Sequence, residues 1–99
     1  MSLEKKIYKK LLQVPKGKIT TYGELAKAVG MTNGQRAVGR IMNKNPYPVI
    51  IPCHRVIKSD GSVGGYAYGE KIKSNMLKKE GLEIKNGKVL DLEKIIHRF

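Results

Sequence analysis

Apolar side chains recur at helical spacing from the start of the chain. The apolar face of a helix predicted over residues 3–14 consists of Leu3, Ile7, Leu11 and Val14. Ser2 can cap the start of this helix, and Pro15 stops it from continuing. The pattern predicts an amphipathic helix that packs against the rest of the domain through one face.

Two short helices joined by a glycine follow. Residues 21–24 (Thr-Tyr-Gly-Glu) have the form of a capping box, which predicts a helix to about Val29. After Gly30, residues 32–35 (Thr-Asn-Gly-Gln) form a second box that opens a helix through Met42. This pair resembles a helix-turn-helix, although any small helical bundle contains such pairs.

The second half of the chain mixes short extended pieces with one longer helix. A connector with two prolines at 45–48 leads into an apolar, extended run, and a glycine and tyrosine loop spans residues 64–69. Residues 70–80 are then predicted to form a helix. We expect this helix to bury Ile72, Met76 and Leu77.

A hairpin and a last short helix complete the predicted fold. Asn86 and Gly87 form a turn between two apolar pieces, which indicates a small hairpin or wing, and Asp91 can cap a final helix. The fold class expected from these elements is mainly α with a small β component, in a winged-helix-like helix-turn-helix domain. A length of 99 residues allows a single domain, so we expect one domain over residues 1–99.

Charge adds a candidate partner. Twenty Lys and Arg against eight Asp and Glu give a net charge of +12, concentrated in the first 59 residues. Such asymmetry favours a polyanion, with nucleic acid first, although a merely lysine-rich surface is the alternative. There is no apolar stretch for a membrane span or a signal peptide. We therefore expect a soluble protein with no membrane partner, cytoplasmic and nucleoid-associated, or nuclear in a eukaryote.

Cys53 and His54 are the strongest candidates for chemistry. Cys53 is the only cysteine, so no internal disulfide is possible, and with two histidines it is a poor ligand set for zinc. We expect no metal and no cofactor. A thiol reacts as the thiolate and needs a nearby base, yet a cysteine among aliphatic residues is more often an inert core residue. On an extended strand His54 would point away from Cys53, so catalysis would need a bridging water or a bend.

The second helix of the pair carries a mixture of arginines and small residues. Arg36 and Arg40 flank a surface that also presents Ala37 and Gly39. Small residues allow close approach of a backbone, and arginines can meet phosphates or insert between bases. Tight helix packing with two solvated arginines explains the same residues equally well.

Taken together, these motifs resemble the DNA-binding, alkyl-accepting domain of the O6-alkylguanine-DNA alkyltransferases, over about residues 7–82. The residues that carry the likeness are Asn45-Pro46, Pro52-Cys53-His54-Arg55-Val56-Ile57, Gly64-Gly65-Tyr66 and Glu80-Gly81. With these landmarks in order, the reading of Cys53 as an inert core thiol is set aside.

The resemblance implies a catalytic role for five residues. Cys53 would accept the alkyl group from guanine O6 irreversibly, so each molecule would act once. His54 would be its base through a water, and Glu80 would orient His54. Asn45 would brace the site through backbone hydrogen bonds, and Tyr22 would assist extrusion of the base and donate a hydrogen bond to it.

The resemblance also implies a surface that binds duplex DNA containing alkylated guanine, with the second helix in the minor groove. Arg36 would fill the space left by the extruded base. The other residues assigned to DNA are Thr21, Gln35, Ala37, Gly39 and Arg40. Those assigned to the base pocket are Met42, Val56, Tyr66 and Ala67.

The resemblance also implies expectations about domain content, oligomeric state and substrate. The N-terminal domain that most members carry is expected to be absent, together with its zinc ligands, and the protein is expected to be a monomer, possibly cooperative on DNA. O6-alkylguanine is the expected substrate, with O4-alkylthymine as a second. The competing interpretations are an alkyltransferase-like protein that binds damage without transfer, and a winged-helix regulator without chemistry.

Overall fold

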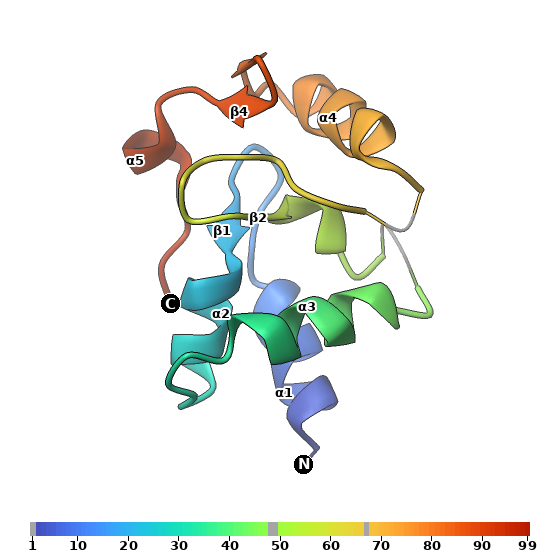
Figure 1. Ribbon diagram of the computed structural model, residues 1–99, viewed down its shortest axis with the longest axis vertical. Coiled ribbons are helices and arrows are strands. Elements are labelled where there is room, and N and C mark those ends of the chain that lie inside the picture. Colours follow the sequence, from blue (N-terminus) through green and yellow to red (C-terminus); the bar gives the residue numbers. More distant parts are fainter. Residues whose placement is uncertain (1, 48–49, 67) are drawn as a thin grey trace.

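The three N-terminal helices form one end of the molecule in the computed structural model, which describes residues 2–47, 50–66 and 68–99 (Figure 1). The helices are α1 (Leu3–Leu11), α2 (Tyr22–Ala28), α3 (Gln35–Asn43), α4 (Glu70–Lys79) and α5 (Leu92–Ile95), with a short 3-10 turn, η1 (Cys53–Arg55). The strands are β1 (Thr20–Thr21), β2 (Val56–Ile57), β3 (Ile84–Lys85) and β4 (Lys88–Val89). The fold is mainly helical with two small sheets, as the sequence predicts.

Helices α2 and α3 form the helix-turn-helix. The Thr21 hydroxyl accepts a hydrogen bond from the Glu24 amide at 3.1 Å and so caps α2 as predicted. Gly34 lies where the helices meet, because a Cβ atom added there would lie 2.9 Å from the Met31 side chain and 3.1 Å from the Ala26 side chain. Only glycine fits this close approach, which holds α3 across α2 and α1.

A parallel pair of strands joins the two halves of the core. Thr20 is paired with Val56 and Thr21 with Ile57. One buried cluster packs α1, α2 and α3 against Cys53 and Val56, and a second packs Ile57 against α4 and the hairpin. Because β1 runs directly into α2, this pairing brings the start of α2 beside η1 (Figure 1).

The predicted hairpin is confirmed. β3 and β4 pair antiparallel around Asn86 and Gly87, which both adopt positive φ angles of 53° and 74°. These values suit a tight two-residue turn, whose twist matches that of the flanking strands. No helix in the described parts of the chain is both long enough and apolar enough to cross a membrane.

Three local predictions about helix ends are wrong. α1 ends at Leu11 rather than at residue 14, although Val14 is still buried. α3 starts at Gln35 after Gly34, and Thr32 provides no cap because residue 33 already turns the chain with a φ of 54°. Asp91 precedes α5 in the left-handed conformation, and its side chain makes no capping bond. In each case the chain direction imposed by packing overrides the local signal.

The prediction for the buried face of α4 is partly wrong. Leu77 is buried, but Ile72 is 47% exposed and Met76 only half-buried, whereas Lys73 is completely buried. The inner face of α4 is therefore set by Lys73 and Leu77, four residues apart. A buried lysine is rare without a partner.

Candidate active site and DNA interface

Cys53 and His54 lie on a 3-10 turn, not on a strand as expected. η1 covers Cys53–Arg55, and β2 begins only at Val56. The Cys53 amide donates to the Ile51 carbonyl at 2.7 Å, and the Arg55 amide donates to the Pro52 carbonyl at 2.9 Å. This bend removes the strand geometry that would have sent the two side chains to opposite faces. Both are buried, with Cys53 5% exposed.

A carboxylate 26 residues away contacts both His54 and its neighbour. His54 Nε2 lies 2.9 Å from Glu80 Oε2. Arg55 donates from Nε to Glu80 Oε1 at 3.0 Å and from Nη2 to Oε2 at 2.9 Å, and its Nη1 donates to the Val14 carbonyl at 2.9 Å. Glu80 follows the last residue of α4, so the position of this helix fixes the orientation of the imidazole.

The charges in this network assign the tautomer of His54. Burial alone would raise the pKa of Glu80, but hydrogen bonds from Arg55 and His54 outweigh it and lower that pKa. An ionised carboxylate only accepts hydrogen bonds, so the proton of neutral His54 lies on Nε2. Nδ1 then carries the lone pair, is buried, and has no hydrogen-bond partner among the described residues. That atom can take a proton.

His54 is neutral at pH 7. Burial lowers its pKa below the usual 6.5, and the bond to Glu80 raises it by less. A neutral imidazole is the form that a general base requires.

We expect the free energy of unfolding to fall as the pH is lowered through about 6.5. Below this value the unfolded chain protonates His54 while the folded chain resists, so acid favours unfolding. Urea denaturation between about pH 5 and pH 8 measures this slope. His54→Asn should reduce it and His97→Asn should keep it. An unchanged slope in His54→Asn would show that burial does not hold His54 neutral.

Asn45 holds the segment that leads into the turn. Its Nδ2 donates to the Ile51 carbonyl at 2.9 Å, and its Oδ1 accepts from the Tyr47 amide at 2.9 Å. The backbone contacts expected of Asn45 are therefore present, and they fix the loop on both sides of residues 48–49, which lie outside the described part of the chain.

Three tyrosines lie close enough to Cys53 for its charge to affect their ionisation: Tyr8, and the predicted site residues Tyr22 and Tyr66. Burial, followed by the charge of Cys53, raises the pKa of Tyr22 and of Tyr66. Both hydroxyls therefore stay protonated at neutral pH and can donate a hydrogen bond. Tyr66 also packs edge-on against Tyr68, with ring centroids 5.5 Å apart.

Lys73 is the residue of this site that the sequence prediction missed. Its Nζ donates to the Gly65 carbonyl at 3.1 Å and lies 5.8 Å from the centre of the Tyr22 ring. Burial lowers its pKa from 10.5 to about 8, although attraction to Cys53 opposes this. Helical spacing places Lys73 on the same face of the helix as Leu77. A lysine is almost never fully buried without a partner, so the sequence predicted an exposed side chain.

The residues predicted to contact DNA gather mainly on α3. Gln35, Arg36 and Arg40 are exposed, Ala37 and Gly39 are half-exposed, and a Cβ atom at Gly39 would meet nothing within 4 Å. Arg36 and Gly39 share a hollow with Tyr22, Lys58 and Gly65. This surface is open, so a DNA backbone could approach α3 closely.

The remaining predicted residues lie deeper. Thr21 is buried and its hydroxyl already caps α2, while Met42 and Val56 are buried in the same cluster as Cys53. Tyr66 packs against that cluster. Ala67, predicted to line the base pocket, lies outside the described residues.

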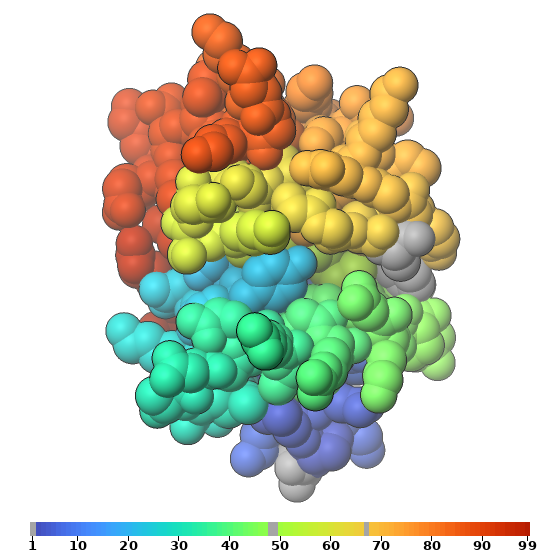
Figure 2. Space-filling view, in the orientation of Figure 1, coloured from blue at the N-terminus to red at the C-terminus, as the bar shows by residue number. Residues whose placement is uncertain are grey.

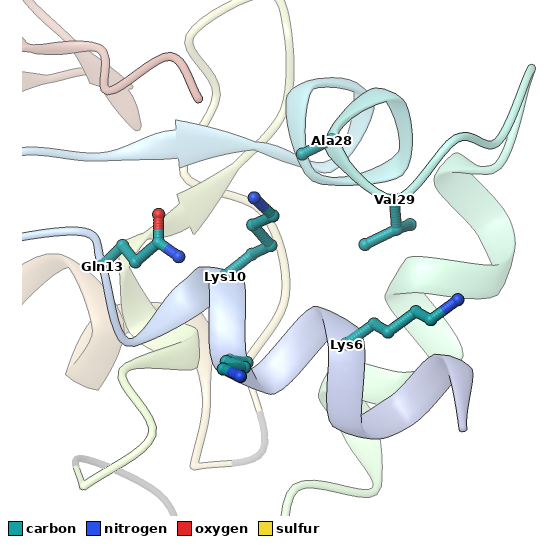
Figure 3. A pocket seen from close by; sticks show the side chains of 6 residues that line it. Lys6, Lys10, Gln13, Ala28 and Val29 are labelled. Carbon is teal, nitrogen blue, oxygen red and sulfur yellow. The ribbon is translucent and has the colours of Figure 1, made fainter. Parts of the chain in front are cut away.

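A separate hollow between α1 and α2 contains none of the predicted site residues. Figure 3 shows Lys6 and Lys10 of α1, with Gln13 just after that helix, on one side and Ala28 and Val29 on the other. These lysines lie beside the C-terminal end of α2, where the helix dipole favours positive charge. Within the described residues, no three His, Cys, Asp or Glu side chains are placed to hold a metal ion.

The fold and this site define a class: a helix-turn-helix-like DNA-binding domain with a candidate cysteine nucleophile. Residues 2–82 match the family described as "6-O-methylguanine DNA methyltransferase, DNA binding domain". The chain belongs to this family.

Individual proteins support the assignment. The methylated-DNA–protein-cysteine methyltransferase of Methanosarcina acetivorans is 46% identical over 78 residues, which are 79% of this chain and 50% of that protein. The chain spans about half the length of most of the curated relatives it matches.

Two solved structures show the same fold. The O6-methylguanine-DNA methyltransferase of Pyrococcus kodakaraensis superimposes with a TM-score of 0.73 and 45% identity, over 82% of this chain and 47% of that one. S. pombe Atl1, in complex with damaged DNA containing O6-carboxymethylguanine, superimposes with a TM-score of 0.86 and 33% identity, over 98% of this chain and 95% of that one.

Proposed function

We propose that this chain repairs DNA by direct reversal: it binds duplex DNA, extrudes O6-alkylguanine and transfers the alkyl group to Cys53. The observation that carries the proposal is the position of Cys53 next to a neutral His54 whose Nδ1 can take a proton and whose Nε2 contacts Glu80 at 2.9 Å. This is the arrangement of an activated nucleophile whose base is oriented by a third group.

The proposed reaction balances without a cofactor. His54 Nδ1 takes the thiol proton through a water, and the Cys53 sulfur forms a bond to the alkyl carbon. The bond from that carbon to O6 breaks, and its electron pair stays on the guanine. The guanine then regains a proton at N1, which replaces the one that the thiol gave up. Tyr22, a protonated donor close to Cys53, stabilises the leaving base by a hydrogen bond.

The product of this step explains why each molecule would act once. An S-alkylcysteine is a thioether, and neither His54 nor Glu80 can remove its alkyl group. The target base is stacked inside the duplex, so it must be extruded before it can reach a buried sulfur. O4-alkylthymine presents the same kind of alkyl carbon and is the second proposed substrate.

A mass measurement tests the proposal. The protein is incubated with a duplex containing one O6-methylguanine, digested, and the peptide with Cys53 is weighed. One added methyl group per molecule is expected, with none after incubation with unmodified duplex. Restored guanine with unmodified Cys53, or no reaction at all, would overturn transfer.

Damage binding without transfer is the second candidate function. It is favoured by the S. pombe Atl1 structure, because that protein matches nearly the whole of this chain and is in complex with damaged DNA. The Cys53, His54 and Glu80 cluster favours transfer instead. The mass measurement distinguishes the two, since tight binding to damaged duplex with unmodified Cys53 supports the second.

Replacing Arg36 is expected to separate extrusion from chemistry. Arg36→Ala removes the exposed side chain that we propose fills the vacated stack, so reaction with damaged duplex should slow roughly tenfold, or ~1.4 kcal/mol. Reaction with free O6-methylguanine base should slow much less, because no stack has to be opened. Rates of Cys53 methylation measure both. Lys78→Ala, which removes an exposed positive charge from the last turn of α4, is the control and should slow neither reaction. Equal slowing of both substrates by Arg36→Ala would refute the role assigned to Arg36.

A further inference from the structure

Lys58 lies on the face of the molecule that carries α3, but the predicted site does not include it. It lines two neighbouring hollows, one shared with Arg36 and Gly65 and the other with Gly23 and Asp60. In Figure 2 the segment after β2 (yellow) and α3 (green) lie on the same face, with residues of β1 and α2 (light blue) between them. Lys58 and Arg36 therefore line the same hollow from two different segments of the chain.

The stem of Lys58 is held against the glycine loop. A Cβ atom at Gly64 would lie 3.5 Å from Lys58 Cγ and 3.6 Å from Lys58 Cε, so the alkyl chain runs along the backbone of Gly64. The backbone amide of Lys58 also donates to the Ser62 carbonyl at 3.0 Å. A fixed stem reduces the side-chain entropy that Lys58 would lose on binding a ligand.

The charge of Lys58 is available to a ligand. Lys58 is exposed and makes no ion pair with any described residue. The nearby Asp60 carboxylate accepts from the Ser62 amide at 2.9 Å and feels the charges of both Lys88 and Lys58, but it forms no ion pair with Lys58. The positive charge also reaches towards the pocket, where it helps to lower the pKa of Lys73.

We propose that Lys58 binds a backbone phosphate of the DNA strand whose base enters the pocket, at the hollow that it shares with Arg36. An ammonium group is a point charge that suits a phosphate, and such contacts fix the register of a strand without reading its sequence. Because Lys58 packs on Gly64, it also ties the bound strand to the loop that precedes Tyr66. The proposal rests on the proposed function and adds to it a residue that positions the strand.

The salt dependence of DNA binding tests this role. Affinity for a short duplex with one O6-methylguanine is measured by fluorescence anisotropy at several salt concentrations for the wild type, Lys58→Ala, Lys58→Arg and Lys78→Ala. Losing one phosphate contact should reduce the slope of log K against log salt by about 0.9 in Lys58→Ala. Lys58→Arg should keep the slope. Lys78 is an exposed lysine in the last turn of α4, so Lys78→Ala controls for net charge and should also keep the slope.

The rate of methyl transfer supplies a second readout. Free O6-methylguanine base has no phosphate, so Lys58→Ala should slow its reaction less than the reaction of the duplex. The proposal is overturned if Lys58→Ala changes the salt slope no more than Lys78→Ala does, or if both substrates slow equally. If the salt slopes of the wild type and Lys58→Ala differ as expected but the wild type never methylates Cys53, the proposed transfer is contradicted. The phosphate contact of Lys58 is then still supported.

Discussion

Glu80→Gln is expected to slow methylation of Cys53 on the order of a hundredfold and to change affinity for DNA by less than about twofold. The neutral amide keeps the shape of the side chain but cannot stabilise the imidazolium that forms when His54 takes the thiol proton. Glu80 contacts His54 and Arg55 and lines neither of the hollows beside α3, the helix that we propose contacts DNA. Single-turnover rates and duplex affinity, measured on the same preparation, give the two values.

Stability has to be measured beside the rate, because Glu80 also accepts two hydrogen bonds from Arg55. Losing the carboxylate leaves the half-buried guanidinium without its charge partner, and we expect a cost of about 1–3 kcal/mol in the free energy of unfolding. Arg55→Met is the matched control, since it removes the same ion pair but keeps the contact of Glu80 with His54. A rate loss in Arg55→Met as large as that in Glu80→Gln would mean that Glu80 acts only by holding the fold together.

Lys73→Met is expected to slow methylation at pH 7 about tenfold while making the folded protein no less stable. Lys73 is buried, and attraction between its ammonium group and Cys53 is one of the causes that act on the pKa of Lys73. The two groups therefore interact through their charges, and removing the ammonium group should affect the reaction at the sulfur. Its pKa of about 8 means that the charge disappears as the pH rises. The ratio of the wild-type rate to the Lys73→Met rate should therefore fall towards one as the pH passes through about 8.

The same lysine gives a stability change of known sign. The folded pKa of Lys73 is lowered to about 8 from 10.5, so between these values the unfolded chain binds more protons than the folded one. Raising the pH through this window should stabilise the wild type relative to Lys73→Met by ~3 kcal/mol. Lys78→Met, at an exposed position of α4, should show neither effect. A constant rate ratio across this range would mean that the charge of Lys73 does not act on Cys53.

Much of the fold could be predicted because its signals are local. The Thr21 cap and Gly30 delimit α2, and Asn86-Gly87 specifies the hairpin turn by backbone preferences that act within a few residues. The capping signals at Thr32 and Asp91 failed because they, too, are only local. A capping residue works only if the packed chain approaches the helix in the right direction, and at these two positions it does not.

The candidate site was predictable to a different degree. Cys53 and His54 stood out as the only cysteine beside a histidine, whereas Glu80 was identified only by likeness to a family, because no periodicity or spacing links it to residues 26 and 27 positions away. The bend at Cys53 and the second role of Glu80 as partner of Arg55 could not be read from residue types. Lys73 was missed because the burial of a charged side chain depends on which distant segments pack over it, here those that carry Tyr22 and Gly65.

The sequence alone determined the helix-turn-helix, the wing, the basic character of the first half and the identity of the candidate nucleophile. Only the tertiary structure decided which atoms could act together. It bent the chain at Cys53, brought Glu80 to His54 Nε2, left His54 Nδ1 buried without a described partner and buried Lys73 against the glycine loop. The physical reason is that turns and caps depend on neighbouring residues, whereas burial, charge pairing and the pKa values they set depend on segments that meet only when the chain is folded.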